Sequence, residues 1–213
     1  MEALQRDVLS NNWLAIIFVS SLVLLFFLKL YTATKLKGYA MSIFNKGFVE
    51  IESEDIYARF SIFHLVFSVF SFLMVSVSIY FIIHEHRQNS VFLFLDYLEI
   101  SYYVSIFMIF RFVLEVLLVK LFETKETLSH FLLSKTSYLY SISIGLLILN
   151  IWYFYSFQNQ YFLILGFTTL FLVRLLVILI NNKNLIIKEL FYFILYLCAF
   201  ELAPLFVLFK SIF

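Results

Sequence analysis

Four ionisable side chains lie inside long apolar segments of the sequence: Arg111 and Glu115 in FRFVLEVLLVK, Arg174 in VRLLVILINNK and Glu201 in YLCAFELAP. A charged side chain at the bilayer centre costs roughly 2.5–3.5 kcal/mol, so four unpaired charges would cost on the order of 10 kcal/mol. Two Arg and two Glu can neutralise one another. Arg111 and Glu115 are four residues apart and can meet on one helix face, whereas Arg174 and Glu201 must come from different helices. We predict a buried network that joins three spans near the membrane midplane.

This network has two interpretations. In the first it is structural, and the charge pairs fix which helices pack together. In the second, Glu201 or Glu115 changes its protonation state during transport or energy coupling, as intramembrane carboxylates do in pumps. Pro204 is relevant to both interpretations because it affects the helix around Glu201. Proline has no amide hydrogen, so the carbonyl of Phe200 is left without its usual helical partner. We expect a kink there that aims the Glu201 carboxylate at Arg111 or Arg174.

A second polar cluster precedes and begins the third apolar segment, with His84 and His86 in HEHRQNS and Asp96 and Glu99 in LDYLEISYY. On a continuous helix, a polar stripe from the outer surface to the membrane centre would occupy about half of the circumference and would contain Asp96, Glu99, Tyr103, Arg111 and Glu115. It has the pattern of an aqueous half-channel, or of a helix that turns its polar side toward its neighbours. His-x-His with carboxylates can also bind zinc. The spacing is common, so we predict no metal, no cofactor and no catalytic residue.

The elements that carry these residues must be membrane-spanning helices. The chain of 213 residues is 63% hydrophobic and only 14% charged, with a mean hydropathy of +0.99. Its apolar runs reach the roughly 20 residues that a helix needs to cross a bilayer. A net charge of +1 gives no basis for nucleic-acid binding. With 4 glycines and no Walker, Rossmann, zincin or nucleophile-elbow motif, the sequence offers no recognisable enzyme site, and we predict no enzymatic activity.

We predict one integral membrane domain over residues 1–213, an all-α bundle of about six transmembrane helices. The expected spans are 13–31, 58–83, 101–122, 137–157, 161–181 and 189–210. The side predicted to be cytoplasmic holds Lys29, Lys35, Lys37, Lys46, Arg59, Lys120, Lys125, Lys135, Lys183 and Lys188. The opposite side holds Arg6, Arg87 and Lys210. The positive-inside rule then places both termini outside, which is the periplasm in a Gram-negative cell.

Two segments lie between or before these spans. Residues 32–57 are basic first and acidic later, with Ile43, Phe44, Phe48 and Ile51 interspersed. We expect this segment to lie along the cytoplasmic interface as a short amphipathic piece, or to form a docking surface for a partner. Residues 91–99 would form either a second interfacial helix or an extension of the tilted third span.

Small polar residues follow helical spacing in two spans. Ser61, His64, Ser68, Ser71 and Ser78 share one face of the second span, and Thr136, Ser143 and Asn150 recur at seven-residue intervals in the fourth. Such lines allow close helix approach and hydrogen bonds between helices. We interpret both as packing seams, and His64 as a hydrogen-bonded packing residue instead of a ligand or proton carrier.

The C-terminal segment YFILYLCAFELAP resembles the signature of a family of uncharacterised short multi-span inner-membrane proteins from Bacteroidota. The matching residues are Tyr192, Tyr196, Cys198, Glu201 and Pro204. The resemblance extends loosely over most of the chain. It implies an inner-membrane location and supplies no activity.

Three functions follow. The first is a non-enzymatic component or assembly factor of an inner-membrane complex of the cell envelope, such as a secretion or gliding complex. Its partners would be other membrane subunits and the lipid bilayer. The second is a proton- or ion-coupled small transporter that uses Glu201 or Glu115. The third is a membrane-embedded metal enzyme that uses the second polar cluster, His84, His86, Asp96 and Glu99, which we call the outer cluster. Length favours the first, because many transporters are larger and show a clearer repeat.

Overall fold

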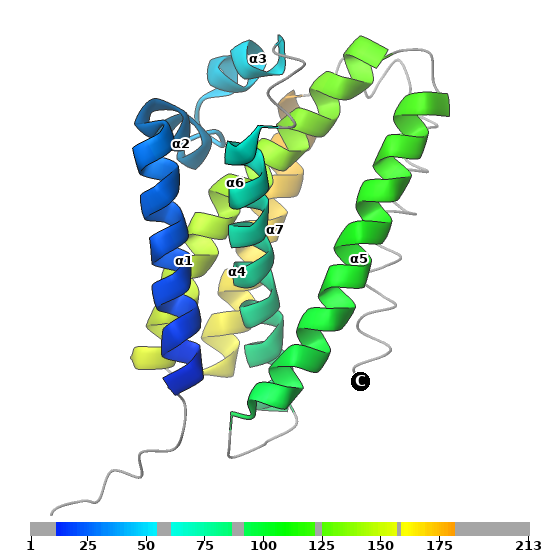
Figure 1. Cartoon of the computed structure of the whole chain (residues 1–213). Coiled ribbons are helices and arrows are strands. Elements are labelled where there is room, and N and C mark those ends of the chain that lie inside the picture. The colour runs from blue at the N-terminus through cyan, green and yellow to red at the C-terminus, as the bar shows by residue number, and fades with distance from the viewer. Residues whose placement is uncertain (1–11, 55–60, 87–91, 122–124, 157–158, 182–213) are drawn as a thin grey trace, which may run out of the picture.

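The structure, a computed structural model, describes residues 12–54, 61–86, 92–121, 125–156 and 159–181. Within these ranges every regular element is a helix, which confirms the predicted all-α class for this part of the chain. The helices are α1 (Asn12–Tyr31), α2 (Ala33–Ala40), α3 (Lys46–Glu54), α4 (Ile62–His86), α5 (Phe94–Leu121), α6 (Lys125–Tyr155) and α7 (Gln160–Asn181). Figure 1 shows the five longer helices side by side, with α2 and α3 at one end.

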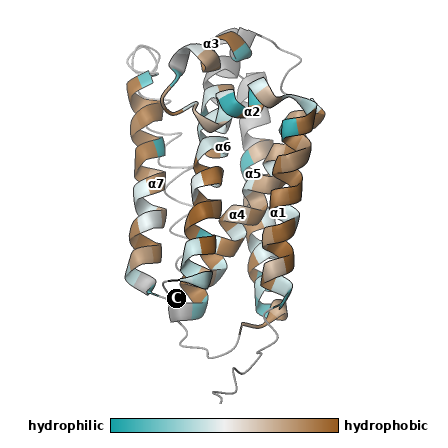
Figure 2. Ribbon diagram, turned by 90° about the vertical axis from the view of Figure 1, so that its left-hand side faces the viewer, coloured by the Kyte–Doolittle hydropathy of each residue, from teal (hydrophilic) through white to brown (hydrophobic). Residues whose placement is uncertain are grey.

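Four of these helices are long and apolar enough to cross a membrane, namely Asn12–Tyr31, Ile62–His84, Leu133–Tyr155 and Tyr161–Asn181. They correspond to the predicted spans 13–31, 58–83, 137–157 and 161–181. The predicted span 101–122 lies almost wholly in α5, which is helical but not one of the four. The predicted span 189–210 lies outside the described residues. The apolar residues continue along the outer surfaces of α1 and α7, as a lipid-facing helix requires (Figure 2).

The start of α5 settles the alternative left open for residues 91–99. Helix α5 begins at Phe94 and runs without a break to Leu121, so the residues from Phe94 to Glu99 extend this helix instead of forming a separate one. The indole Nε1 of Trp13 on α1 donates to the carbonyl of Phe92 at 3.2 Å, just before the helix starts. The Tyr97 hydroxyl lies 3.2 Å from Oγ of Ser76 on α4. These contacts hold the beginning of α5 against α1 and α4.

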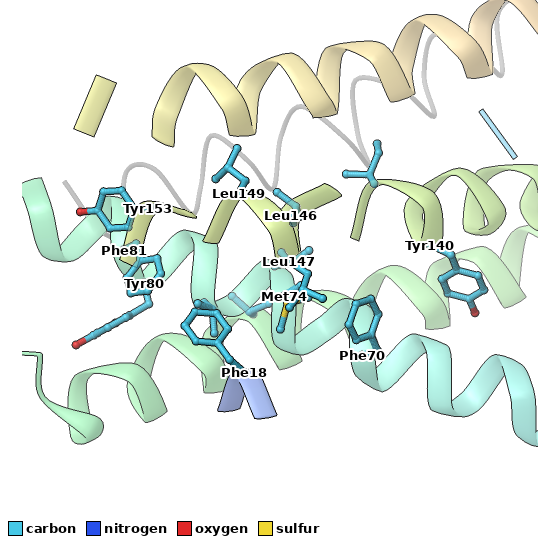
Figure 3. Close-up of a cluster of buried hydrophobic side chains, with 14 of the residues drawn as sticks. Phe18, Phe70, Met74, Tyr80, Phe81, Tyr140, Leu146, Leu147, Leu149 and Tyr153 are labelled. Atoms are coloured by element: carbon cyan, nitrogen blue, oxygen red, sulfur yellow. The ribbon is translucent and has the colours of Figure 1, made fainter. Parts of the chain in front are cut away.

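Helices α4 and α6 form the centre of the bundle. They pack extensively against each other, while α1 and α5 contact α4 and α7 contacts α6. Figure 3 shows the buried side chains between them, with Tyr80, Phe81 and Tyr153 toward one end and Tyr140 toward the other. Lipid tails are as apolar as these side chains, so helix association in a bilayer depends on close packing and on hydrogen bonds between helices.

A hydrogen-bonded seam joins α4 to the last third of α6. The Asn150 side chain is fully buried, accepts from Oγ of Ser78 at 3.0 Å and donates to the carbonyl of Met74 at 3.2 Å. Ser143, one heptad earlier, is also buried, but its hydroxyl donates to Leu139 within its own helix at 2.8 Å. The predicted packing seam is therefore confirmed for Ser78 and Asn150.

Replacing Asn150 with Ala should weaken the α4–α6 contact. Hydrogen bonds between membrane helices contribute about 0.6 kcal/mol on average and up to about 1.7 kcal/mol, and the two-bond site of Asn150 places it toward the upper value. Thermal unfolding in detergent of Asn150→Ala, Ser78→Ala and the double variant measures the coupling between them. Ser143→Ala is the matched control, because its hydroxyl makes a bond within α6. If the effects of Asn150→Ala and Ser78→Ala simply add in the double variant, the hydrogen-bonded seam would be contradicted.

Residues 32–54, which follow the first span, fold over one end of the bundle. Thr32 has extended backbone angles (φ −155°, ψ 94°), which separate α1 from α2. Helices α2 and α3 both pack against α6 and against each other (Figure 1). We call these two helices the cap. The expected amphipathic segment is thus a pair of short helices with one side buried in the bundle.

Candidate functional site

Tyr39 of α2 is the side chain that fixes the cap to the bundle. It is fully buried, and its hydroxyl lies 3.1 Å from Nε2 of His64 on α4, a hydrogen bond whose donor depends on the His64 tautomer. The hydroxyl of Tyr140 on α6 donates to the backbone carbonyl of His64 at 3.1 Å. His64 therefore sits between two tyrosines from two other helices. This geometry supports the interpretation of His64 as a hydrogen-bonded packing residue.

Aromatic rings surround this polar contact. The Phe67 ring, one turn after His64, stacks on Tyr140 with centroids 4.3 Å apart and an interplanar angle of 11°. Phe48 of α3 meets Tyr39 edge-on at 5.1 Å and 89°. Phe48 also fills the space beside Gly38, where a Cβ atom would collide with its ring. The cap is therefore packed closely enough that Gly38 is the residue that allows α2 and α3 to approach.

A carboxylate completes the cluster from the cap side. Glu52 of α3 is buried and forms an ion pair with Lys35 of α2, whose side chain is partly exposed. Burial raises the pKa of the Tyr39 phenol well above its ordinary value, and the nearby Glu52 carboxylate and Tyr140 raise it further. Tyr39 is therefore a neutral phenol at any physiological pH. We call Tyr39, Glu52, His64 and Tyr140 the latch.

The first half of the apolar part of α6 receives further contacts from the cap. Oγ of Ser42 donates to the carbonyl of Ser137 at 3.0 Å, and Oγ of Ser141 donates to the carbonyl of Ala40 at 2.7 Å. On the α7 side, Nδ2 of Asn181 donates to the hydroxyl of Tyr138 at 2.7 Å. One stretch of α6 thus binds the cap and α7 at the same time.

The residues of the latch connect the cap to the bundle. Their hydroxyl, imidazole and carboxylate groups contact one another across α2, α3, α4 and α6, and aromatic rings cover them. Low local polarity strengthens hydrogen bonds that are satisfied and makes a lost partner costly. The arrangement can hold the cap in one position, and breaking one contact would release several others.

Removing the Tyr39 hydroxyl tests the latch. Tyr39→Phe keeps the ring but removes the bond to His64, so we expect a loss of about 1–3 kcal/mol, the usual cost of a buried group left without its partner. Hydrogen exchange of α2 and α3 should accelerate in this variant. Tyr155→Phe, at an exposed tyrosine on α6, is the control and should leave exchange in the cap unchanged.

The same residue gives a pH dependence. The folded pKa of Tyr39 is raised, so the unfolded phenol ionises first as the pH passes its ordinary value of about 10. The unfolded state then holds fewer protons, and stability falls as the pH rises above that value. Tyr39→Phe should reduce this alkaline loss of stability, measured by unfolding between neutral and strongly alkaline pH. An unchanged alkaline limb would contradict a buried neutral phenol at this position.

The predicted midplane network is only partly within the described residues. Arg174 on α7 is 2% exposed, and its Nη2 donates to the carbonyl of Lys135 on α6 at 3.4 Å. Arg111 lies half-buried on α5, and Glu115 occupies the following turn of that helix. Glu201 and Pro204 lie outside the described residues, so the pairing of the four charges stays a prediction.

In the cluster of His84, His86, Asp96 and Glu99, the structure shows an aromatic contact at His84. His84 is buried, and its ring stacks on Phe92 with centroids 4.0 Å apart at 15°. His86 is the last residue of α4, Asp96 is half-buried and Glu99 is exposed. Among the described residues, no group of three or more His, Cys, Asp or Glu side chains could hold a metal ion.

Burial along α5 divides the proposed polar stripe. Tyr97, Ile100 and Val104 are buried, and Arg111 falls on the same side at helical spacing. Glu99 and Tyr103 are exposed and lie on another side of the helix. The stripe from the outer surface to Arg111 therefore does not face one neighbour along its length.

Comparison with known proteins bears on this fold as a whole. A family model described as a domain of unknown function, DUF4271, matches residues 14–212, which covers every helix from α1 to α7 and the C-terminal segment beyond them. The chain belongs to the DUF4271 family. No curated protein and no solved structure matches it. The resemblance to an uncharacterised family is confirmed at this level.

Three residues of the latch, Tyr39, Glu52 and Tyr140, and the burial of Lys135 were not predicted from the sequence. Tyr39 and Glu52 lie in a polar segment, and nothing local distinguishes them from exposed residues. Lys135 was assigned to the cytoplasmic side by its charge, yet its side chain is 2% exposed at the start of the apolar part of α6. Among the latch residues, only His64 could be assigned a packing role from the sequence, because it shares a helix face with serines on α4.

Proposed function

We propose that this DUF4271 protein is a non-enzymatic component or assembly factor of a complex in the inner membrane of a bacterial cell envelope. The observation that carries the proposal is the latch. Polar groups that could serve a substrate or an ion are instead bonded between helices, with Tyr39, His64 and Tyr140 covered by aromatic rings. Such an interior suits a rigid scaffold for other subunits.

The finer topology belongs to the same proposal. Six spans with both termini in the periplasm would put the cap on the cytoplasmic side, where the lysines of residues 29–46 satisfy the positive-inside rule. A Bacteroidota origin fits the C-terminal pattern that ends at Glu201 and Pro204. In this proposal Arg111, Glu115, Arg174 and Glu201 form the midplane network, and Pro204 bends the last span toward it.

Affinity purification from native membranes tests the proposal. A tagged chain, extracted in mild detergent after brief cross-linking, should bring down a constant set of membrane subunits in fixed ratio. Tyr39→Phe with the same expression level should recover less of this set, because a loosened cap alters the cytoplasmic face. Tyr155→Phe is the matched control. Recovery of the chain alone, with and without cross-linking, would contradict a role in a complex.

A proton- or ion-coupled transporter is the second candidate, and one observation favours it. Arg174 and Lys135 are two cations, each 2% exposed, at the α6–α7 contact. Buried charge within spans marks ion pathways in many transporters. Reconstituted vesicles with an imposed ion gradient distinguish the two functions: flux that is lost in Glu201→Gln, at normal protein abundance, would support transport over a structural role.

A further inference from the structure

Three exposed side chains lie at the end of α2 and in the turns that follow it, namely Lys37, Met41 and Phe44. The amide of Met41 donates to the carbonyl of Lys37 at 3.1 Å, and the amide of Phe44 donates to the carbonyl of Met41 at 2.9 Å. Hydrogen-bonded turns thus follow α2 directly and keep Met41 and Phe44 close to its end. Tyr39 and Ser42 are buried in the bundle. We call Lys37, Met41 and Phe44 the outer face of the cap.

This outer face is more apolar than a water-facing helix surface requires. Met41 is 53% exposed and Phe44 is 89% exposed, and Ile51 on α3 is 72% exposed. Single exposed apolar residues are ordinary on proteins, but exposed apolar residues close to a lysine at a helix end are typical of a segment that lies in a membrane interface.

The position of α2 brings this face to the bilayer surface. Helix α1 has 20 residues, which gives a length of about 30 Å, the thickness of the hydrocarbon layer. It ends at Tyr31, and α2 begins two residues later at Ala33. Figures 1 and 2 both show α2 beside that end of α1. Lys29, in the last turn of α1, is also exposed.

We propose that the outer face of the cap binds the anionic phospholipids of the leaflet in which α1 ends. Met41 and Phe44 enter the boundary between headgroups and acyl chains, and Lys37 and Lys29 contact the phosphates. The occupant follows from charge complementarity and from continuity with the lipid-facing side of α1. This binding does not depend on the proposed role in a complex, because it requires only the bilayer that holds the spans.

Fluorescence quenching in a reconstituted membrane tests the depth of this face. The full chain, with Cys198→Ala to remove the native thiol, carries bimane on Phe44→Cys or, as a second variant, on Met41→Cys. Position 44 is 89% exposed and position 41 is 53% exposed, so labelling disturbs little packing, least of all at position 44. Phe27→Cys on the outward side of α1 is the reference for a lipid-facing site. The vesicles contain phosphatidylcholine and phosphatidylglycerol, with bromine on the acyl chains of one or the other lipid.

The proposal expects brominated lipid to quench bimane at position 44 and position 41, as at position 27, while aqueous iodide quenches all three weakly. Strong quenching by iodide without quenching by lipid would overturn it, because the face would then be in water. A label that neither quencher reaches would also overturn it, since protein would cover the face.

Lipid selectivity is the second readout. Bromine on phosphatidylglycerol should quench position 44 more than the same amount of bromine on phosphatidylcholine. Lys37→Gln should reduce this preference by roughly fivefold, the effect of one lysine at an anionic surface, and Lys37→Arg should retain it. Equal quenching by both lipids in the chain with Lys37 intact would overturn the anionic preference.

Discussion

Phe67→Ala should lower the free energy of unfolding by about 3–5 kcal/mol, the usual cost of truncating a buried phenylalanine. Phe67 is fully buried, stacks on Tyr140 and contacts the rings of Tyr39, Phe63 and Phe70. Its removal leaves a cavity where α2, α4 and α6 meet, and rigid neighbouring rings cannot close it. Thermal or denaturant unfolding in detergent measures the loss.

Two control variants distinguish the loss of internal packing from the mere loss of an apolar side chain as the cause of the lower unfolding free energy. Phe27 is an exposed phenylalanine on α1, so Phe27→Ala removes the same atoms without creating an internal cavity. Phe67→Leu fills part of the space and should fall between Phe67→Ala and the original chain. The cap should also become more accessible to hydrogen exchange in Phe67→Ala. If Phe67→Ala and Phe27→Ala unfold alike, the stacked cluster is not a source of stability.

Arg174→Gln should also destabilise the protein strongly. If Arg174 forms the proposed ion pair with Glu201, its loss should cost about 3–5 kcal/mol, because the other charge would stay buried without compensation. The guanidinium also bonds to the carbonyl of Lys135, so α6 and α7 should separate more readily in this variant. The fraction of chain that elutes as a single folded species in size-exclusion chromatography reports the effect.

The double variant Arg174→Gln/Glu201→Gln tests the proposed pairing. If these two charges neutralise each other, the double variant should recover most of the stability lost in Arg174→Gln, since no lone charge remains. Lys29→Gln, at an exposed cation in α1, is the control for loss of positive charge. Additive losses in the double variant would show that Glu201 is not the partner of Arg174.

The membrane spans were predictable because each needs a long apolar run, and that property is local in the sequence. Four of the six predicted spans coincide with helices that are long and apolar enough to cross a membrane. The beginning of α5 at Phe94 was harder to place, because Leu95, Leu98 and Ile100 continue the apolar pattern backward from the span. Periodicity alone cannot separate an interfacial helix from an extension of a span.

The site was predictable only where a signal was local. His64 shares a helical face with Ser71 and Ser78, which led correctly to a packing role. The burial of Tyr39 and Glu52 depends on α4 and α6, which come later in the chain, so composition around residues 32–57 indicated only an interfacial segment. The pairing of Arg174 depends equally on contacts between distant helices, and charge counting could propose it but not place it.

The contacts between the cap and α6 can form only after α6 has been synthesised. Ser42 meets Ser137, which is 95 residues further along the chain, and Ala40 meets Ser141 across 101 residues. A ribosome therefore delivers α2, α3 and α4 to the membrane long before the surface on which the cap closes has been made. Tyr39 and Glu52 can meet His64 and Lys35 early, but the side of the cap that packs on α6 has no partner until α6 has been made. Closure of the cap therefore requires that α6 has already been made and packed against the earlier helices.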